Sequence, residues 1–373
     1  MEEGNSILDK VISSKKTNQI EQFNPSDTVS QLLKALTTRE EDVLRRRFGL
    51  LGKEKETLEE IGATYKVTRE RIRQIEKTAI QKISQLKNFN ELIASIENTV
   101  YSVLEQHGAA MEENDLLAEL LQVVGDSQMN RQNILFVISE LLKKKFKTIR
   151  PDEVFKQSWQ LSHAPIHLIR DSIKTLFDTI AKNGKPATIS SILSQFKETD
   201  LFKHNPQLLT EEAVTSYLNM SNSISRNPFD EFGLKEWGSI VPKRMNDKIY
   251  LVLKRHGKPM HFTEIAQKIN EVKFDTRKAY PPTVHNELIL NSRYVLVGRG
   301  IYALKEWGYK PGVVSNVLID ILNRSSESLT RSQLVEKVLE QRIVKKNTIH
   351  LALTDKTKFK KNEDGTYSLA VPS

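Results

Sequence analysis

The stretch VTRERIRQIE, residues 67–76, carries four polar side chains that could recognise the edges of DNA bases: Arg69, Glu70, Arg73 and Gln74. An arginine can pair bidentately with guanine, a glutamine can do so with adenine, and a carboxylate can accept a hydrogen bond from cytosine N4. Each such pair is worth about 1–3 kcal/mol of discrimination against the wrong base. A run of charges is more often a solvated, salt-bridged helix face, so the neighbouring elements must decide between the two interpretations.

The pattern of apolar residues around this stretch predicts a helix that starts at Thr68. Ile72, Ile75, Ala79 and Ile83 recur at steps of three or four residues, which places them on one buried stripe. The four polar residues fall on the other side of the helix. We therefore expect the isoleucines to hold the helix to its domain, while the polar side chains face outward near the helix N-terminus.

A second, shorter helix is expected directly before it. Thr57 and Glu60 have the spacing of a capping box, and Lys66 and Val67 leave room for only a tight turn before Thr68. Helix, brief turn and helix make a helix-turn-helix, whose second helix enters the DNA major groove. The start of the first helix could bind a phosphate through backbone N–H groups. The expected phosphate contacts are Thr57, Leu58, Arg45, Arg47, Thr68, Arg71 and Lys77.

Residues 36–86 resemble region 4 of the housekeeping bacterial sigma factors, through LTTREEDVLRRRFGL, TLEEIG and VTRERIRQIEKTAIQKI. The resemblance implies binding to the −35 promoter element, with Arg69, Glu70, Arg73 and Gln74 on the bases and the start of the shorter helix on a phosphate. It also implies docking on the flap of the RNA polymerase β subunit through the first helices. Phe23 is the sole aromatic residue before the match. We therefore expect no segment that melts the −10 element, and no self-sufficient initiation factor.

The rest of the chain contains a degenerate repeat. TVHNELILNSRYVLVGRGIYAL (283–304) aligns without a gap with TIHLALTDKTKFKKNEDGTYSL (348–369), and looser copies lie upstream. Each copy predicts a helix, a glycine-containing turn, two more helices and a hairpin, with turns at Gly298-Arg299-Gly300 and Asp364-Gly365. Three helices and a hairpin are typical of a winged helix.

The sequence therefore predicts a mainly α fold with small β-hairpins: an N-terminal helix-turn-helix domain followed by four tandem winged-helix (α+β) domains. The expected boundaries are 1–25 for a flexible arm, 26–90 for the helix-turn-helix domain, and 92–163, 165–240, 243–309 and 311–373 for the winged helices. Through HGKPMHFTEIA and GRGIYALKEWGY, the third winged helix resembles the HARE-HTH domain of the RNA polymerase delta subunit. That class is taken to bind DNA or to join transcription and DNA-modification machinery.

Basic residues at the predicted hairpins could reach DNA phosphates. The candidates are Arg293, Arg299, Lys358, Lys360 and Lys361. A plain solvated hairpin explains them equally well, and the sequence leaves both interpretations open.

Composition sets further bounds. A net charge of +9 and a pI of about 9.3 permit a nucleic-acid partner. The absence of cysteine excludes disulfides and cysteine-ligated zinc, and fits a reducing cytosol. The longest apolar stretches, such as 134–138, are too short to span a bilayer. With no glycine-rich phosphate loop or metal-ligand cluster in the sequence, we expect no catalytic residue, metal, cofactor or small-molecule substrate.

Two functions follow as hypotheses. The first is a DNA-binding transcription factor or sigma-factor-like regulator that reads a −35-like element in double-stranded DNA and acts with core RNA polymerase. The second is an adaptor that binds polymerase or another protein and has nonspecific affinity for DNA. Both place the protein in the cytoplasm, associated with the nucleoid, and neither is an enzyme.

Overall fold

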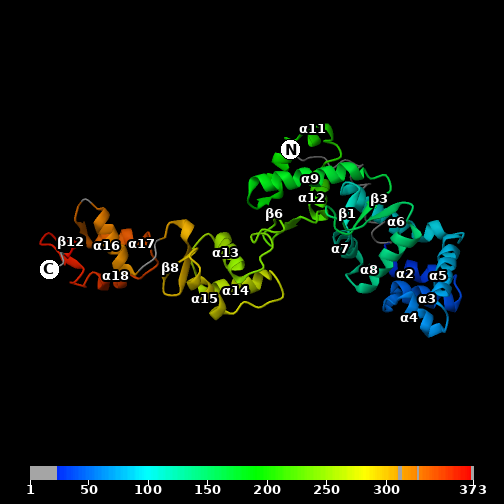
Figure 1. The fold of residues 1–373 in the computed structure, drawn as a ribbon, viewed down its shortest axis with the longest axis horizontal. Helices are drawn as coiled ribbons and strands as arrows, with labels where there is room; N and C mark the ends of the chain where they lie inside the picture. The colour runs from blue at the N-terminus through cyan, green and yellow to red at the C-terminus, as the bar shows by residue number, and fades with distance from the viewer. Residues whose placement is uncertain (1–22, 310–312, 326, 371–373) are drawn as a thin grey trace, which may run out of the picture. The chain divides into compact units, whose positions relative to one another are not determined.

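The computed structural model of the protein describes residues 23–309, 313–325 and 327–370 (Figure 1). The chain is mainly helical, as the sequence predicts, with small antiparallel sheets. It divides into two compact units. Unit 1 runs to Arg226 and includes Asp230–Lys235, whereas unit 2 comprises Asn227–Phe229 and the chain from Glu236 onward. Most of the predicted flexible arm, 1–25, lies outside the described residues.

The N-terminal domain consists of four helices and one short 3-10 turn: α2 (Pro25–Leu33), α3 (Thr38–Phe48), η1 (Leu50–Gly52), α4 (Leu58–Tyr65) and α5 (Arg69–Ser84). Polar caps fix three of the helix starts. Thr37 and Thr57 each form a capping box with the glutamate three residues later, and Thr68 Oγ1 accepts a hydrogen bond from the N–H of Arg71. The predicted starts at Thr57 and Thr68 are confirmed.

The turn between α4 and α5 is tight because of two local features. Lys66 adopts a left-handed conformation with φ of 54°, which ends α4. A Cβ on Gly62 would lie 2.8 Å from the carbonyl oxygen of Val67, so only glycine allows the chain to turn so closely. Beneath the turn, Ile61 and Ile72 pack together with no exposed surface. These contacts set the geometry of the helix-turn-helix.

Each of the four segments that follow has three helices and a three-stranded sheet, and the second segment has one additional helix. The first contains α6 (Phe89–Gln106), β1 (Ala110–Glu112), α7 (Glu113–Val124), α8 (Gln128–Phe136), η2 (Val137–Leu141), β2 (Phe146–Ile149) and β3 (Ser158–Leu161). The second contains α9 (Ile166–Asn183), β4 (Ala187–Thr188), α10 (Ile189–Phe196), α11 (Asp200–His204), α12 (Glu211–Met220), β5 (Ile224–Arg226) and β6 (Glu231–Leu234).

Unit 2 contains the other two segments. The third consists of α13 (Met245–His256), β7 (Met260–His261), α14 (Phe262–Val272), α15 (Pro281–Leu290), β8 (Tyr294–Gly298), β9 (Ile301–Leu304) and η3 (Lys305–Trp307). The fourth consists of α16 (Val314–Arg324), β10 (Leu329–Thr330), α17 (Arg331–Leu339), α18 (Lys346–Ala352), β11 (Phe359–Lys361) and β12 (Thr366–Leu369). The element order is that of a winged helix, and the division into four winged-helix domains stays a prediction.

The hairpins form at the predicted turns, but each sheet has one strand more than the sequence predicts. The extra strand follows the turn after the first helix of its segment and pairs with the last strand of the hairpin. In the third segment Met260 pairs with Tyr302, and in the fourth Leu329 pairs with Tyr367. These strands are two or three residues long, too short for an alternating pattern to reveal them.

The N-terminal domain and the first segment of unit 1 share one hydrophobic core. Leu32, Leu44 and Leu50 from the former and Ile134 and Phe136 from the latter belong to a single cluster of buried residues. Because α8 supplies the contact, the two parts are packed against each other rather than joined by a free linker.

Candidate DNA interface

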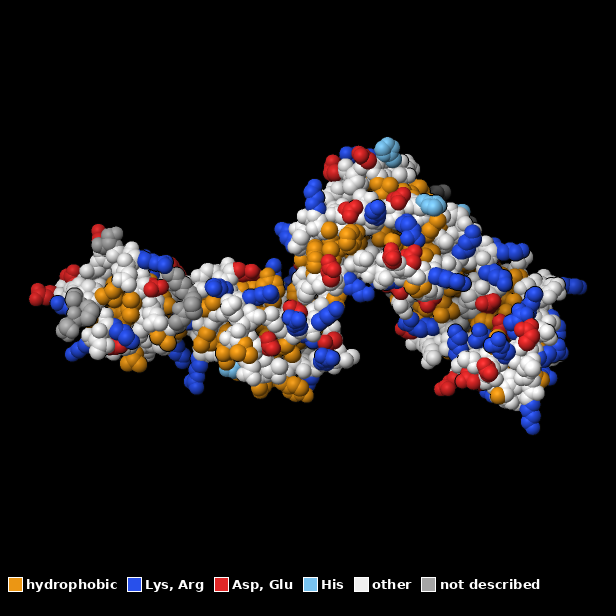
Figure 2. All heavy atoms as spheres, viewed as in Figure 1, with side chains coloured by type: hydrophobic (Ala, Val, Ile, Leu, Met, Phe, Trp, Pro, Cys, Tyr) orange, Lys and Arg blue, Asp and Glu red, His pale blue; other side chains and the backbone are white. Residues whose placement is uncertain are grey.

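The outward side of α5 carries the predicted base-reading residues. Arg69, Glu70, Arg73 and Gln74 are all exposed, while Ile72 is fully buried on the opposite side. Lys and Arg side chains gather over the part of unit 1 that α3, α4 and α5 form (Figure 2). The structure thus brings the four predicted residues together on one accessible helix face.

Two of these residues bind each other. The Arg73 guanidinium donates two hydrogen bonds to the Glu70 carboxylate, of 2.7 and 2.9 Å. The Arg73 side chain holds the pKa of Glu70 below its ordinary value, so Glu70 is ionised at neutral pH and can accept a hydrogen bond from a base. Both side chains are more than half exposed. Because exposed pairs are worth about 1 kcal/mol or less, this one can open at little cost.

A second pair on the same face joins Arg71 to Gln74. The Arg71 guanidinium donates a hydrogen bond of 3.0 Å to Gln74 Oε1. The Gln74 amide nitrogen is a donor, so it can approach a base while its oxygen keeps this contact. Arg71 is thereby placed to orient Gln74 as well as to reach a phosphate.

The start of α4 is closed by its own cap. The Glu60 carboxylate accepts hydrogen bonds from the Thr57 backbone N–H at 2.7 Å and from the Thr57 hydroxyl at 2.8 Å. These bonds lower the pKa of Glu60. The side chain of Leu58 packs against the small core of the helix-turn-helix. The cap uses the backbone N–H groups of Thr57 and Glu60, so a phosphate would have to bind those of Leu58 and Glu59, and this contact stays a prediction.

The arginines at the end of α3 have partners inside the domain. Arg45 pairs with Glu41 at 3.2 Å, and Arg47 pairs with Glu76 of α5 at 3.3 Å. Arg47 also donates a hydrogen bond to the carbonyl oxygen of Glu56. The Arg47 pair ties α3 to the inner side of α5, while phosphate contacts by Arg45 and Arg47 stay a prediction. Thr68, Arg71 and Lys77 lie exposed around the base-reading residues.

Helix α8 is the last helix before the hairpin of the first segment. Its outward side is buried, whereas the corresponding side of α5 is exposed. Asn133 has no exposed surface; its Oδ1 accepts a hydrogen bond from the Leu51 N–H at 3.4 Å, and its Nδ2 donates to Ser26 Oγ at 3.1 Å. The rings of Phe136 and Phe48 lie 4.9 Å apart. This side of α8 packs on the N-terminal domain and cannot enter a DNA groove.

The corresponding helix of the second segment, α12, is covered in the same way. Ser216 Oγ donates a hydrogen bond of 2.7 Å to the carbonyl oxygen of Ala110, and the Tyr217 hydroxyl donates one of 2.8 Å to that of Gly108. A Cβ on Gly108 would lie 2.6 Å from the Cβ of Ala213, so glycine permits this close approach. Burial raises the pKa of Tyr217. The sequence analysis missed both packing roles, because no local pattern records them.

The predicted wing residues lie on two separate sheets. Arg299 is exposed at the turn between β8 and β9, and the exposed Arg293 guanidinium lies 5.9 Å from the ring centroid of Tyr250. Lys358 pairs with Asp355 at 3.3 Å. Lys360 and Lys361 are exposed on β11. The structure places these residues on accessible surface, and their phosphate contacts stay a prediction.

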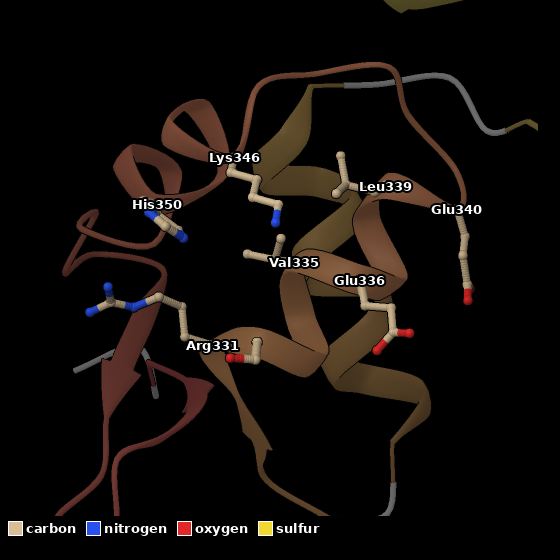
Figure 3. A pocket seen from close by; sticks show the side chains of 8 residues that line it. Arg331, Val335, Glu336, Leu339, Glu340, Lys346 and His350 are labelled. Atoms are coloured by element: carbon tan, nitrogen blue, oxygen red, sulfur yellow. The ribbon is translucent and has the colours of Figure 1, made fainter.

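A hollow of about 730 Å³ lies between α17 and α18 in unit 2 (Figure 3). Lys346 and His350 of α18 line one side, with Val335 between the two helices and Glu336 on the other side. The lining mixes cations, two carboxylates, one serine and apolar groups, and within these described residues no hydrogen bond joins the serine to a base. In the described part of the chain, no group of three or more histidine and acidic side chains is placed to hold a metal ion. Likewise, none of the described helices is both long and apolar enough to cross a membrane.

The fold of α4 and α5, with the exposed polar face of α5, defines a helix-turn-helix DNA-binding domain. Comparison with known families gives the particular type: the model described as "Sigma-70, region 4" matches residues 32–85. The RNA polymerase sigma factor SigA of Lactococcus lactis subsp. cremoris is 48% identical over 80 residues, which cover 21% of this chain and 22% of the relative. SigA of Listeria monocytogenes serovar 1/2a is 49% identical over 71 residues, covering 17% and 19%.

The chain therefore contains a sigma-70 region 4 domain. The chain spans about a fifth of the length of the curated relatives that it matches. The matched region holds all four predicted base-reading residues and stops before α6.

Proposed function

We propose that this protein is a transcription regulator that reads a −35-like promoter element through α5 and acts with RNA polymerase. The observation that carries the proposal is the exposed face of Arg69, Glu70, Arg73 and Gln74 within a sigma-70 region 4 domain. The proposed function is binding rather than catalysis. Promoter binding would take place in the cytoplasm, at the nucleoid.

In the proposed complex, the N-terminal part of α5 lies in the major groove. The ionised Glu70 accepts a hydrogen bond from cytosine N4, arginines donate to guanine, and Gln74 pairs with adenine. The bond between Glu70 and Arg73 opens or is shared with a base as the helix enters the groove. The backbone at the start of α4, together with Arg71 and Lys77, holds the phosphates on either side.

Contact with polymerase is proposed on the N-terminal domain, because the sigma resemblance places the β-flap contact on its first helices. α8 packs on α2 and η1, so part of this surface is already used inside the chain. The side of α2 left open carries the exposed residues Gln31 and Lys34. We infer that polymerase binds this open side. If binding of core polymerase to the immobilised full chain did not weaken in Gln31→Glu/Lys34→Glu, this assignment would be wrong.

Fluorescence anisotropy of the full chain on two duplexes tests the DNA proposal. One duplex carries TTGACA and the other a scrambled hexamer, and both are titrated over a salt series. We expect at least a tenfold preference for TTGACA, about 1.4 kcal/mol, and its loss in Glu70→Ala. As a matched control, Lys360→Ala should weaken binding to both duplexes equally or leave both unchanged. Equal binding of the unmodified chain to the two duplexes would rule out sequence reading by α5.

The salt series also measures how many phosphates the protein contacts, because the slope of log K against log salt is about −0.9 for each one. The outward sides of α8 and α12 are packed inside unit 1. We therefore expect the phosphate contacts counted by the salt slope to come from the N-terminal domain and unit 2, and not from α8 or α12.

A further inference from the structure

The outward side of α15 in unit 2 is uncharged and largely apolar. Val284 and Leu288 are buried, and helical geometry places Pro282, Thr283, Asn286, Ile289 and Leu290 on the opposite side. Ile289 is 61% exposed and Leu290 is 82% exposed. Charged residues make up 28% of the chain, so an exposed helix side without one is unexpected for a surface that meets only water.

Tyr280, which caps α15 and is 58% exposed, extends this surface. We call Tyr280, Pro282, Ile289 and Leu290 the α15 stripe. Hydrophobic side chains gather over the region of α14 and α15 (Figure 2). The exposed apolar side chains lie at the two ends of α15, with the polar Thr283 and Asn286 between them. Exposed large apolar side chains close together on one helix, such as Ile289 and Leu290, mark an interaction site more often than single ones do.

The corresponding helices of unit 1 indicate how the chain uses this position. α8 and α12 bury their outward sides on a neighbouring part of the same chain, through Asn133 and Tyr217. In both cases the helix packs against protein. α15 occupies the same place in its segment, and its outward side has the composition of a packing surface.

Charge around the stripe indicates the occupant. Arg277 and Lys278 are exposed in the loop before α15, and Lys278 Nζ lies 5.8 Å from the ring centroid of Tyr280. Lys273 is exposed in the same loop, and Glu287, the carboxylate of α15, is half-buried at its flank. The stripe thus has a basic border on its N-terminal side.

This combination favours an acidic protein helix over two other occupants. DNA would meet no cation on the outward side of α15, and the exposed Ile289 and Leu290 offer nothing to base edges except the thymine methyl group. A second copy packed by two-fold symmetry would bring the same basic border to both sides of the contact. An amphipathic helix with an apolar side and flanking carboxylates satisfies both the stripe and its border.

We propose that the α15 stripe is a docking site for an acidic amphipathic helix of a partner protein. The site is independent of DNA reading by α5, because it lies in the other unit. A partner bound at this site would be brought to DNA by the chain. The protein would then act both as a DNA-binding regulator and as an adaptor, the two functions that the sequence left as alternatives.

The test uses the full chain and fluorescein-labelled synthetic peptides. The probe is an amphipathic helical peptide with leucine at i, i+3, i+4 and i+7 and glutamate elsewhere. One control peptide replaces glutamate with lysine, and another shuffles the leucines off the stripe. We expect the acidic peptide to bind at least tenfold more tightly than either control.

Variants then locate the site. Ile289→Ser/Leu290→Ser should weaken binding of the acidic peptide at least tenfold, and Arg277→Glu/Lys278→Glu should reverse the preference between acidic and basic peptides. Leu208→Ser is the matched control, because Leu208 is an exposed leucine of unit 1. The preference for the TTGACA duplex over the scrambled one should stay unchanged in all of them, which separates this proposal from the proposed function.

Three results would overturn the proposal. The first is equal binding of the acidic and shuffled peptides. The second is unchanged binding after Ile289→Ser/Leu290→Ser with an unchanged circular dichroism spectrum. The third is a dimer in light scattering that Leu290→Ser converts to monomer, because a second copy would then cover the stripe.

Discussion

Helices α5 and α8 occupy the same place in their own three-helix arrangements, yet one faces solvent and the other faces protein. The outward side of α5 carries Arg69 and Arg73, whose charges are costly to bury without partners. α8 instead presents Asn133 and Phe136. An asparagine can be buried when both its donor and its acceptor are satisfied, as Ser26 and Leu51 satisfy Asn133. The charge of the outward side therefore separates a helix that can read DNA from one that supports the fold.

The largest expected effect comes from removing the aromatic side chain through which α8 contacts the N-terminal domain. Phe136→Ala should lower the free energy of unfolding of unit 1 by about 3–5 kcal/mol, because a buried phenylalanine leaves a cavity. Urea denaturation followed by circular dichroism measures it. Tyr101→Ala is the control, because Tyr101 is 42% exposed and its loss should cost little. A loss below about 1 kcal/mol in Phe136→Ala would mean that α8 does not support the domain.

Substitutions on the exposed polar face of α5 should change the sequence preference for DNA rather than the stability. Arg73→Ala and Gln74→Ala should each remove about 1–3 kcal/mol of discrimination between TTGACA and a scrambled duplex. Their stability should change by no more than about 0.5 kcal/mol, because both side chains are exposed. Arg131→Ala on α8, where Arg131 pairs with Asp126, should leave the preference intact. Anisotropy measures the preference, and a loss in Arg131→Ala equal to that in Arg73→Ala would break the comparison.

Asn133 gives a sharper form of the same comparison, because it is polar but has no access to DNA. Asn133→Ala leaves the Leu51 N–H and the Ser26 hydroxyl without this partner, which should cost about 1–3 kcal/mol of stability. DNA preference should not change. Asn286→Ala, at an exposed helix position, serves as the control in the same denaturation experiment. A change in sequence preference in Asn133→Ala would contradict the supporting role of α8.

The smallest effect concerns two carboxylates on opposite sides of α5. Burial raises the pKa of Glu76 despite its pairing with Arg47, whereas Arg73 lowers that of the exposed Glu70. For Glu76 the folded chain holds its proton to higher pH than the unfolded chain, so stability falls as pH rises from the ordinary pKa through the folded one. Glu76→Gln should therefore flatten this pH dependence and change stability at pH 7 by about 1 kcal/mol or less.

Denaturation midpoints at several pH values between 4 and 8 measure the effect, with Glu70→Gln as the control. Glu70 is exposed and its pKa is lowered, so it stays ionised across most of that range. A steeper dependence in Glu76→Gln than in the unmodified chain would show that the Arg47 pair, and not burial, controls Glu76.

The sequence by itself determined the type of the N-terminal domain and the helix face on which the four predicted base-reading residues lie. The caps at Thr57 and Thr68 and the apolar stripe through Ile72 act over a few residues, so periodicity and spacing reveal them. The hairpin turns are local in the same sense. Such features follow from backbone preferences and helix geometry, which any stretch of chain carries with it.

Only the tertiary structure decided which helices remain open. Asn133 meets Ser26 across 107 positions of sequence and Leu51 across 82, and no local pattern specifies such pairs. The two- and three-residue strands beside each hairpin form because the folded segment brings them to an edge that needs hydrogen bonds. The sequence predicts α8 and α15 alike, each as the last helix before a hairpin. Whether the outward side of such a helix meets protein or solvent depends on distant residues and on how the chain folds around it.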